Sequence, residues 1–182
     1  MQPAHESAPS PSPLPGPVRQ NGYVVRDLDG AIEAWLAAGV GPWLILPSMK
    51  QTGSLYRGEP TEPRVTIGFA NSGELQIELI MQEDDSPSIY REFLDAGHEG
   101  FHHLAWWAED FDAVTSAVSA SWPVVHEGNA GGVARFAYYD TGGVTCTVVE
   151  LMELTDATRW LVSTVRDAAL GWDGSEPVRS LF

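Results

Sequence analysis

The chain has 182 residues, 43% of them hydrophobic, and no stretch near the ~20 apolar residues of a membrane span, which indicates one soluble domain or two small modules sharing a core. Its single cysteine, Cys146, excludes an internal disulfide and a zinc site built from several thiolates. The net charge of −15 argues against nucleic acids and anionic membranes as partners, because their phosphates would be repelled.

The first 17 residues contain six prolines among serine and alanine, with few large apolar side chains. Such a segment cannot bury enough surface to offset the entropy lost on ordering it, so we predict a disordered tail over residues 1–17. The segment also lacks the basic start and the continuous apolar run of a secretory signal. We therefore expect a cytoplasmic protein.

Residues 18–83 show the pattern of a βαβββ module. A strand is predicted at 20–25 and a helix at 27–36, where acidic residues begin the helix and a Gly-Pro segment ends it. Glycine, proline, asparagine and serine then separate the extended stretches 43–47, 54–56, 64–70 and 75–80.

A linker and a second βαβββ module follow. Residues 84–100 contain a short helix that begins after Ser88 and ends at Gly97. The pattern restarts over residues 101–154, with a helix predicted at 111–120 and strands at 101–107, 124–127, 134–139 and 145–152. Residues 155–182 supply a helix, whose apolar stripe would pack on the sheet or on a second subunit, and an irregular tail.

The two modules correspond residue by residue, which indicates an internal duplication. Adding 83 to the residue number takes Gln20 to His103, and adding 72 takes Glu78 to Glu150. Neighbouring small, aromatic and acidic positions correspond in the same way. We therefore predict an α+β fold made of two tandem βαβββ modules.

Strand alternation places four polar residues on one face of the sheet. In LQIELI and TVVELME, apolar residues alternate with Glu78 and Glu150, so the apolar side chains face the helices and both glutamates face the other way. By the same rule His103 and Gln20 share that face, whereas His102 points toward a helix. Two unpaired carboxylates on a covered face are costly, so we expect a divalent metal with nitrogen and oxygen ligands; Ni, Co, Mn, Mg, Fe and Zn are all compatible.

Each of these residues also has an ordinary structural explanation. His103 could be a hydrogen-bonded core histidine, Gln20 a polar residue at a strand start, and the two glutamates solvated carboxylates at a sheet edge. The aspartates at 27–29 and 110–112 are explained by helix capping and the helix dipole.

The segments QNGYVVRDLD, LQIELIM, GFHHLAWWAED and TVVELME resemble the metal-binding strands of the vicinal oxygen chelate superfamily, which comprises glyoxalases, bleomycin-resistance proteins and ring-cleaving dioxygenases. The resemblance covers residues 18–154 and is nearest to the branch with glyoxalase I and methylmalonyl-CoA epimerase. It implies an open, cup-shaped mixed β-sheet with the helices outside. It also implies that one divalent metal is held by Gln20, Glu78, His103 and Glu150.

That branch moves a proton on a carbon next to a carbonyl or enediolate that the metal holds. The resemblance therefore implies a metal-dependent isomerase, epimerase or lyase for a small oxygenated substrate, with Glu150 as ligand and base and Glu78 as the residue that returns a proton. The set departs from the epimerase pattern at Glu78, where an amide is expected, and the few basic residues form no obvious motif for a glutathione or CoA substrate.

Two alternative functions and the oligomeric state stay open at this point. The alternatives are an Fe(II) ring-cleaving dioxygenase, which generally uses two histidines and one carboxylate, and a non-catalytic protein that binds or sequesters a small molecule. Members of the superfamily often pair between chains, so the resemblance also suggests a homodimer.

Overall fold

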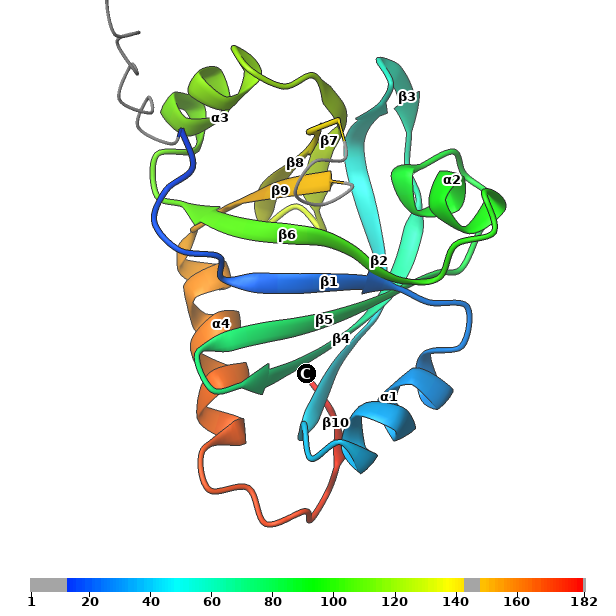
Figure 1. Ribbon diagram of the computed structural model, residues 1–182, viewed down its shortest axis with the longest axis vertical. Helices are drawn as coiled ribbons and strands as arrows, with labels where there is room; N and C mark the ends of the chain where they lie inside the picture. The colour runs from blue at the N-terminus through cyan, green and yellow to red at the C-terminus, as the bar shows by residue number, and fades with distance from the viewer. Residues whose placement is uncertain (1–12, 143–147, 182) are drawn as a thin grey trace, which may run out of the picture.

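One β-sheet organises the part of the chain that the computed structural model describes, residues 13–142 and 148–181 (Figure 1). Its strands are β1 (Gln20–Val24), β2 (Trp43–Tyr56), β3 (Glu59–Thr61), β4 (Arg64–Ser72), β5 (Leu75–Gln82), β6 (Gly100–Ala108), β7 (Val124–Ala130), β8 (Ala134–Asp140), β9 (Val148–Glu153) and β10 (Val178–Ser180). The helices are α1 (Leu28–Ala37), α2 (Ile89–Asp95), α3 (Phe111–Ser119) and α4 (Asp156–Ala169). The mixed α+β class predicted from the sequence is confirmed.

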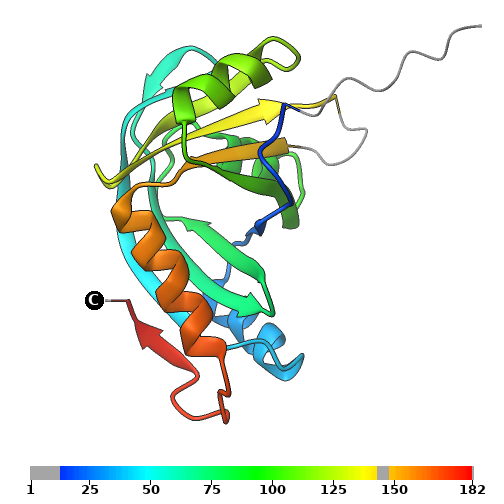
Figure 2. The ribbon, with the colours of Figure 1, turned by 90° about the vertical axis from the view of Figure 1, so that its left-hand side faces the viewer.

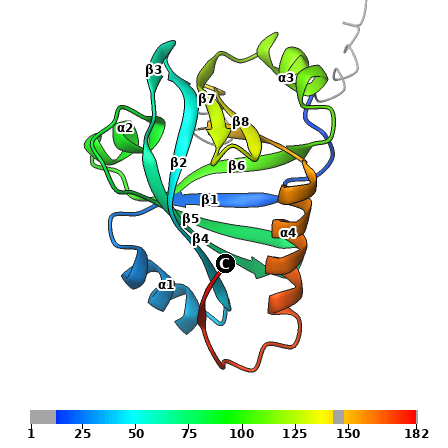
Figure 3. The same cartoon turned by 180° about the vertical axis from the view of Figure 1, so that it is seen from behind.

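The sheet closes on itself, because β2 pairs with β4 along its first part and with β7 along its second part (Figure 3). The ring runs β2-β4-β5-β1-β6-β9-β8-β7 and returns to β2, while β3 and β10 pair with β2 beside the ring. The open sheet that we predicted is wrong at this junction. The physical reason is that the stretches 43–47 and 54–56, predicted as two strands, form one strand of 14 residues, which is long enough to change partners.

The two halves of the ring pair in the same way. β1 is parallel to β5 and β6 is parallel to β9, while β1 and β6 run antiparallel at the centre. Across that centre Gln20 pairs with Ala105, and Gly22 pairs with His103. The parallel pairs match the duplication, because Gly22 pairs with Glu78 and Ala105 pairs with Glu150, and the offsets of 83 and 72 residues relate the first pair to the second. The division of the chain into two modules and a linker remains a prediction, which this register favours.

Two helices cover the outside of the ring. Asp27 caps α1 and Asp110 caps α3, and each accepts a hydrogen bond from a backbone N–H three residues later. α1 packs against apolar residues on the outer side of β5, and α3 packs in the same manner against β9. The apolar residues that alternate with Glu78 and Glu150 therefore face helices, and the glutamates face the inside of the ring.

The other two helices close the ends of the ring, so the prediction that the helices lie outside is wrong for them. In Figure 1, α2 and α4 lie at opposite ends of β1. Tyr90 and Leu94 of α2 belong to the apolar cluster inside the ring, and the fully buried Val165 of α4 belongs to the same cluster. Figure 2 shows α4 crossing the ends of the strands. An apolar stripe predicts that a helix packs, but it does not say which surface the helix meets.

Both tails contain structure that we did not predict. Leu14 packs against the cluster beneath α3, and Trp106 Nε1 donates a hydrogen bond to the Gly16 carbonyl oxygen at 3.1 Å, so residues 13–17 differ from the predicted disordered tail. Near the C-terminus, β10 pairs in parallel with β2 where an irregular tail was predicted. Segments this short carry no periodic signal. Residues 1–12 of the tail and 145–147 of a predicted strand lie outside the described residues.

The described residues contain no helix that is both long and apolar enough to cross a membrane.

Candidate metal centre

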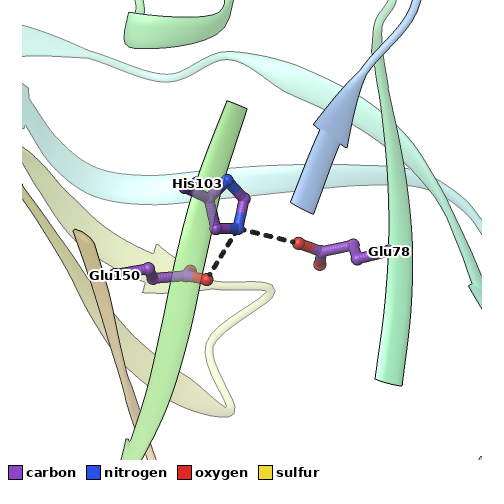
Figure 4. Close-up of side chains that lie close together, drawn as sticks. All are labelled: Glu78, His103 and Glu150. Atoms are coloured by element: carbon purple, nitrogen blue, oxygen red, sulfur yellow. Dashed lines mark ion pairs between the residues drawn. The ribbon is translucent and has the colours of Figure 1, made fainter. Parts of the chain in front are cut away.

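Three of the four predicted ligands lie together inside the ring (Figure 4). His103 Nε2 lies 3.1 Å from Glu150 Oε2 and 3.4 Å from Glu78 Oε2. One donor atom from each residue lies within 4.8 Å of the other two, and the exposed fractions of Glu78, His103 and Glu150 are 7%, 0% and 6%. We call these three residues the Glu-His-Glu cluster.

The pairing of four strands brings the cluster together. Glu78 pairs with Gly22, Gly22 pairs with His103, and Ala105 pairs with Glu150. Paired residues on neighbouring strands project to the same face, and so do residues two apart on one strand, so all three side chains point into the ring. β5 and β9 flank the β1–β6 pair, and the two glutamates therefore approach His103 from opposite sides.

The ring of His103 occupies the space above Gly22. A Cβ atom at position 22 would lie 1.8 Å from His103 Cε1 and 2.1 Å from His103 Nε2. These distances are far inside van der Waals contact, so any larger residue at this position would displace the imidazole. Gly22 therefore positions the cluster without supplying a donor atom, a role that the sequence pattern did not reveal.

The donor atoms of the cluster fit a divalent metal. Glu78 Oε2, His103 Nε2 and Glu150 Oε2 are buried, and apart from one another they have no polar partner among the described residues. Buried polar atoms are nearly always satisfied, and buried carboxylates need a compensating cation. One imidazole nitrogen with two carboxylates is a donor set that several divalent metals accept.

Without a metal, a proton on His103 supplies the positive charge between the carboxylates. Burial lowers the pKa of His103, but its contacts with Glu150 and Glu78 outweigh burial and raise that pKa to about 9. The pKa of Glu78 is raised, first by burial and then by the charge of Glu150, against the opposing effect of His103. A metal-ligating imidazole must be deprotonated, so a metal and a proton compete for His103.

Metal affinity is therefore expected to rise with pH until the pH reaches the pKa of His103. The apparent association constant should increase about tenfold per pH unit from about pH 6.5 to about 8.5, with about one proton released per metal bound. Isothermal titration with Mn²⁺ in two buffers of different ionisation enthalpy measures the affinity and the proton release together. An affinity that stays constant over this pH range would contradict the competition.

Gln20, the fourth predicted ligand, lies on the same inner face but is engaged in a different contact. Its side chain is buried, and Nε2 donates a hydrogen bond to Gln76 Oε1 at 2.8 Å. Gln20 Oε1 accepts no hydrogen bond from any described residue. This contact holds the amide and leaves its oxygen available, so Gln20 remains a predicted ligand. We did not single out Gln76 as an orienting residue, although its alternation with Glu78 in LQIELI was the available signal.

His102 supports His103 from behind the cluster. Its ring contacts a helix, with 5.0 Å to the ring centroid of Phe93 on α2, but the outer face predicted from strand parity is wrong, because the β1–β6 register shifts at His102 and its ring lies 6.2 Å from that of Tyr138 inside the ring. Its Nδ1 lies 3.0 Å from His103 Nδ1. Burial, followed by the charge of His103, lowers the pKa of His102 well below its usual value, so His102 is neutral. A neutral His102 can accept a hydrogen bond from His103 Nδ1–H through its own Nδ1. Such a bond directs His103 Nε2 toward the glutamates.

A chain of hydrogen bonds runs along the inner face beside Glu150. Gln51 Nε2 donates to the Tyr90 hydroxyl at 2.9 Å, and Tyr90 donates to the Tyr138 hydroxyl at 3.0 Å. Tyr138 pairs with Glu150 across β8 and β9, and its ring packs against the ring of His103 with 5.1 Å between the centroids. Because each hydroxyl accepts from the residue before it, the O–H of Tyr138 is left to donate.

A cavity of about 80 Å³ adjoins the cluster, and both glutamates line it together with Tyr90, Tyr138 and Leu161 of α4. A larger groove of about 750 Å³ lies between α3 and the β7–β8 pair, but no residue of the Glu-His-Glu cluster lines it. The small cavity is therefore the space in which a ligand can contact the Glu-His-Glu cluster.

A sequence profile of the Glyoxalase/Bleomycin resistance protein/Dioxygenase superfamily matches residues 19–139. The matched region contains Gln20, Glu78 and His103, whereas Glu150 lies beyond it. A search of curated proteins found no significant match.

Solved structures have the same fold. A hypothetical protein from Bacillus halodurans C-125 aligns with a TM-score of 0.56 at 16% identity, covering 77% of this chain and 95% of that one. Methylmalonyl-CoA epimerase from Mycobacterium tuberculosis aligns with a TM-score of 0.53 at 23% identity, covering 86% and 97%. Identities this low establish a shared fold and not a shared activity. Because the family profile matches more than half of its length, the chain belongs to the glyoxalase, bleomycin resistance protein and dioxygenase superfamily, also called vicinal oxygen chelate.

Proposed function

We propose that the protein is a divalent-metal-dependent isomerase, epimerase or lyase of the glyoxalase-like type. The observation that carries the proposal is the set of three buried, facing donor atoms of Glu78, His103 and Glu150, whose only polar partners among the described residues are one another. These residues, with Gln20 as the fourth ligand, would hold the metal. A divalent metal bound there supplies a Lewis acid that polarises a carbonyl oxygen and stabilises negative charge on it.

The two glutamates divide the proton chemistry between them. Glu150 removes a proton from the carbon next to the carbonyl, and the hydroxyl of Tyr138 beside it can donate a hydrogen bond to a substrate oxygen. Glu78 approaches from the other side of His103, which places its carboxyl group to return a proton on the opposite side from Glu150. Removal on one face and return on the other produces epimerisation, whereas removal and return between neighbouring carbons produces isomerisation.

The proposal is tested by metal content and by proton exchange. The purified protein is expected to bind about one divalent metal per chain, and the metal-loaded form should exchange the CH₂OH protons of hydroxyacetone with D₂O faster than the EDTA-treated form, by about 10²-fold or more. Elemental analysis and proton NMR measure the two quantities. A chain that binds no metal at near-stoichiometric level would overturn the proposal and favour the binding-protein alternative.

The donor set counts against the dioxygenase alternative. Non-haem Fe(II) oxygenases generally use two histidines and one carboxylate, whereas this cluster has one histidine and two carboxylates. Oxygen consumption by the iron-loaded protein with catechol tests this point, and we expect none above the protein-free rate.

A further inference from the structure

A proline-rich segment covers part of the outer surface of the second module. Leu14 and Val18 pack against the apolar cluster beneath α3, to which Trp106 belongs. Trp106 Nε1 also donates a hydrogen bond to the Gly16 carbonyl oxygen at 3.1 Å. Figure 1 shows the segment running from α3 to the start of β1. The sequence that covers this surface is Pro-Leu-Pro-Gly-Pro-Val, residues 13–18.

The duplication identifies the equivalent surface of the first module, beside α1. The offset of 83 residues takes Tyr23 to Trp106, and the offset of 72 takes Leu79 to Leu151. Trp106 and Leu151 belong to the cluster that the proline-rich segment covers. Tyr23 and Leu79 therefore mark the corresponding surface on the other half of the ring.

An apolar groove of about 370 Å³ lies at this surface, and we call it the α1 groove. Its lining consists of Tyr23, Val25, Ala31, Ala34, Trp35, Ala38, Leu79 and Gly100. The ring of Tyr23 lies 5.3 Å from that of Trp35 and 5.6 Å from that of Phe101, measured between centroids. Phe101 is 43% exposed, so the aromatic surface continues beyond the groove.

The linker does not cover the α1 groove in the way that residues 13–18 cover the other surface. The chain reaches β6 from α2, which closes the end of the ring, and not from the outer surface of α1. The offset of 83 residues relates Leu14 to Gly97, which has no side chain to place in a groove. Gly97 has a φ of 84° and follows the end of α2, where it turns the chain.

The lining of the α1 groove favours an uncharged apolar segment. None of the described residues that line it carries a charge, although the whole chain has a net charge of −15. Aromatic rings offer flat faces against which proline packs, and a proline-rich segment has little conformational entropy to lose on binding. The equivalent surface of the second module is covered by a segment of this composition.

We propose that the α1 groove is a docking site for a proline-rich segment of a partner protein, with an aliphatic side chain between prolines as in Pro13-Leu14-Pro15. Residues 13–18 of the chain itself are not the occupant, because they cover the other surface. The groove lies outside the ring, and no residue of the Glu-His-Glu cluster lines it. The inference therefore goes beyond the proposed function and does not depend on a metal.

The test uses the full-length chain and a peptide that copies residues 13–18, PLPGPV, with both ends blocked. The indole N–H signals of Trp35 and Trp106 in two-dimensional NMR follow the titration. The Trp35 signal should shift in a saturable manner with a Kd of about 1 mM or tighter. The Trp106 signal should keep its position, because the tethered segment already covers that surface at a high effective concentration.

Ala34→Glu should weaken peptide binding by at least about tenfold, because it places a charged side chain in the apolar groove. Ala34 is exposed on α1 and glutamate is a good helix former, so the chain should still fold. Ala37→Glu is the matched control, since Ala37 is exposed on the same helix but does not line the groove. Circular dichroism melts show whether each variant is folded.

Leu14→Asp tests whether the two surfaces are equivalent. The substitution places a charge in the apolar contact of residues 13–18, so this segment should leave the surface that contains Trp106. The peptide should then shift the Trp106 signal as well as the Trp35 signal, and the chain should bind two peptides where the native chain binds one.

The proposal is overturned if the native chain shows no saturable shift of Trp35, or if folded Ala34→Glu binds the peptide as tightly as the native chain. An unchanged Trp106 signal in folded Leu14→Asp would overturn it too, because the two surfaces would not be equivalent. If the native chain sediments as a dimer that Ala34→Glu converts to a monomer, a second copy occupies the groove and the proline-rich partner is wrong. Metal affinity should be native in Ala34→Glu, so none of these outcomes bears on the proposed function.

Discussion

Gly22→Ala is expected to weaken metal binding by about 100-fold or more while the chain still folds. The new Cβ would lie 1.8 Å from His103 Cε1, so the imidazole must leave the position in which Nε2 faces Glu78 and Glu150. Alanine is compatible with a β-strand, so the backbone of β1 has no reason to change. Titration with Mn²⁺ at constant pH measures the affinity, and thermal melts of the metal-free protein measure the folding.

Gly68→Ala is the matched control for this substitution. Gly68 also lies in a strand, β4, and a Cβ there would contact Trp43 at 3.3 Å on the outer side, away from the cluster. We expect this variant to lose about 1 kcal/mol of stability from the tight contact and to bind metal as the native protein does. Native metal affinity in Gly22→Ala would show that His103 is not the ligand, since its ring could not stay in place.

The candidate site could be predicted because both the duplication and the strand alternation are visible as patterns in the sequence. The offsets that relate Gln20 to His103 and Glu78 to Glu150 need only the sequence, and alternation then assigns each side chain to a face. The structure brings Glu78, His103 and Glu150 within reach of one another, and the parallel pairs Gly22–Glu78 and Ala105–Glu150 follow the two offsets, whereas the register between β1 and β6 could not be predicted from them. Their action as ligands and bases remains a prediction.

The features that we missed depend on which surfaces meet, and sequence periodicity carries no information on that. The closure of the ring depends on one long strand that changes partners from β4 to β7. Gly22 was visible only as a small residue, because its role depends on the ring of a residue 81 positions later. The apolar stripe of α4 predicted burial, but nothing in the stripe indicates that the helix lies against the cavity beside the two glutamates.

Glu150→Gln is expected to abolish proton exchange without destabilising the metal-free protein. An amide cannot remove a proton, and loss of a general base costs about 10²–10⁴-fold in rate. Removing one carboxylate leaves His103 paired with Glu78, so the cluster keeps a balanced pair of charges and loses the repulsion between the glutamates. The free energy of unfolding without metal should therefore be unchanged or higher. Proton NMR in D₂O measures the exchange, and denaturant titration measures the stability.

The metal-dependent stability distinguishes a ligand from a residue with a packing role. At a metal concentration 1,000 times the native Kd, bound metal stabilises the native protein by about 4 kcal/mol, and a 100-fold weaker affinity reduces this to about 1.4 kcal/mol. Glu127→Gln is the control, because Glu127 is an exposed strand residue outside the cluster and should keep the full metal-dependent gain. If Glu150→Gln kept both the exchange rate and the full gain, Glu150 would be neither base nor ligand, and the two-glutamate mechanism would fail.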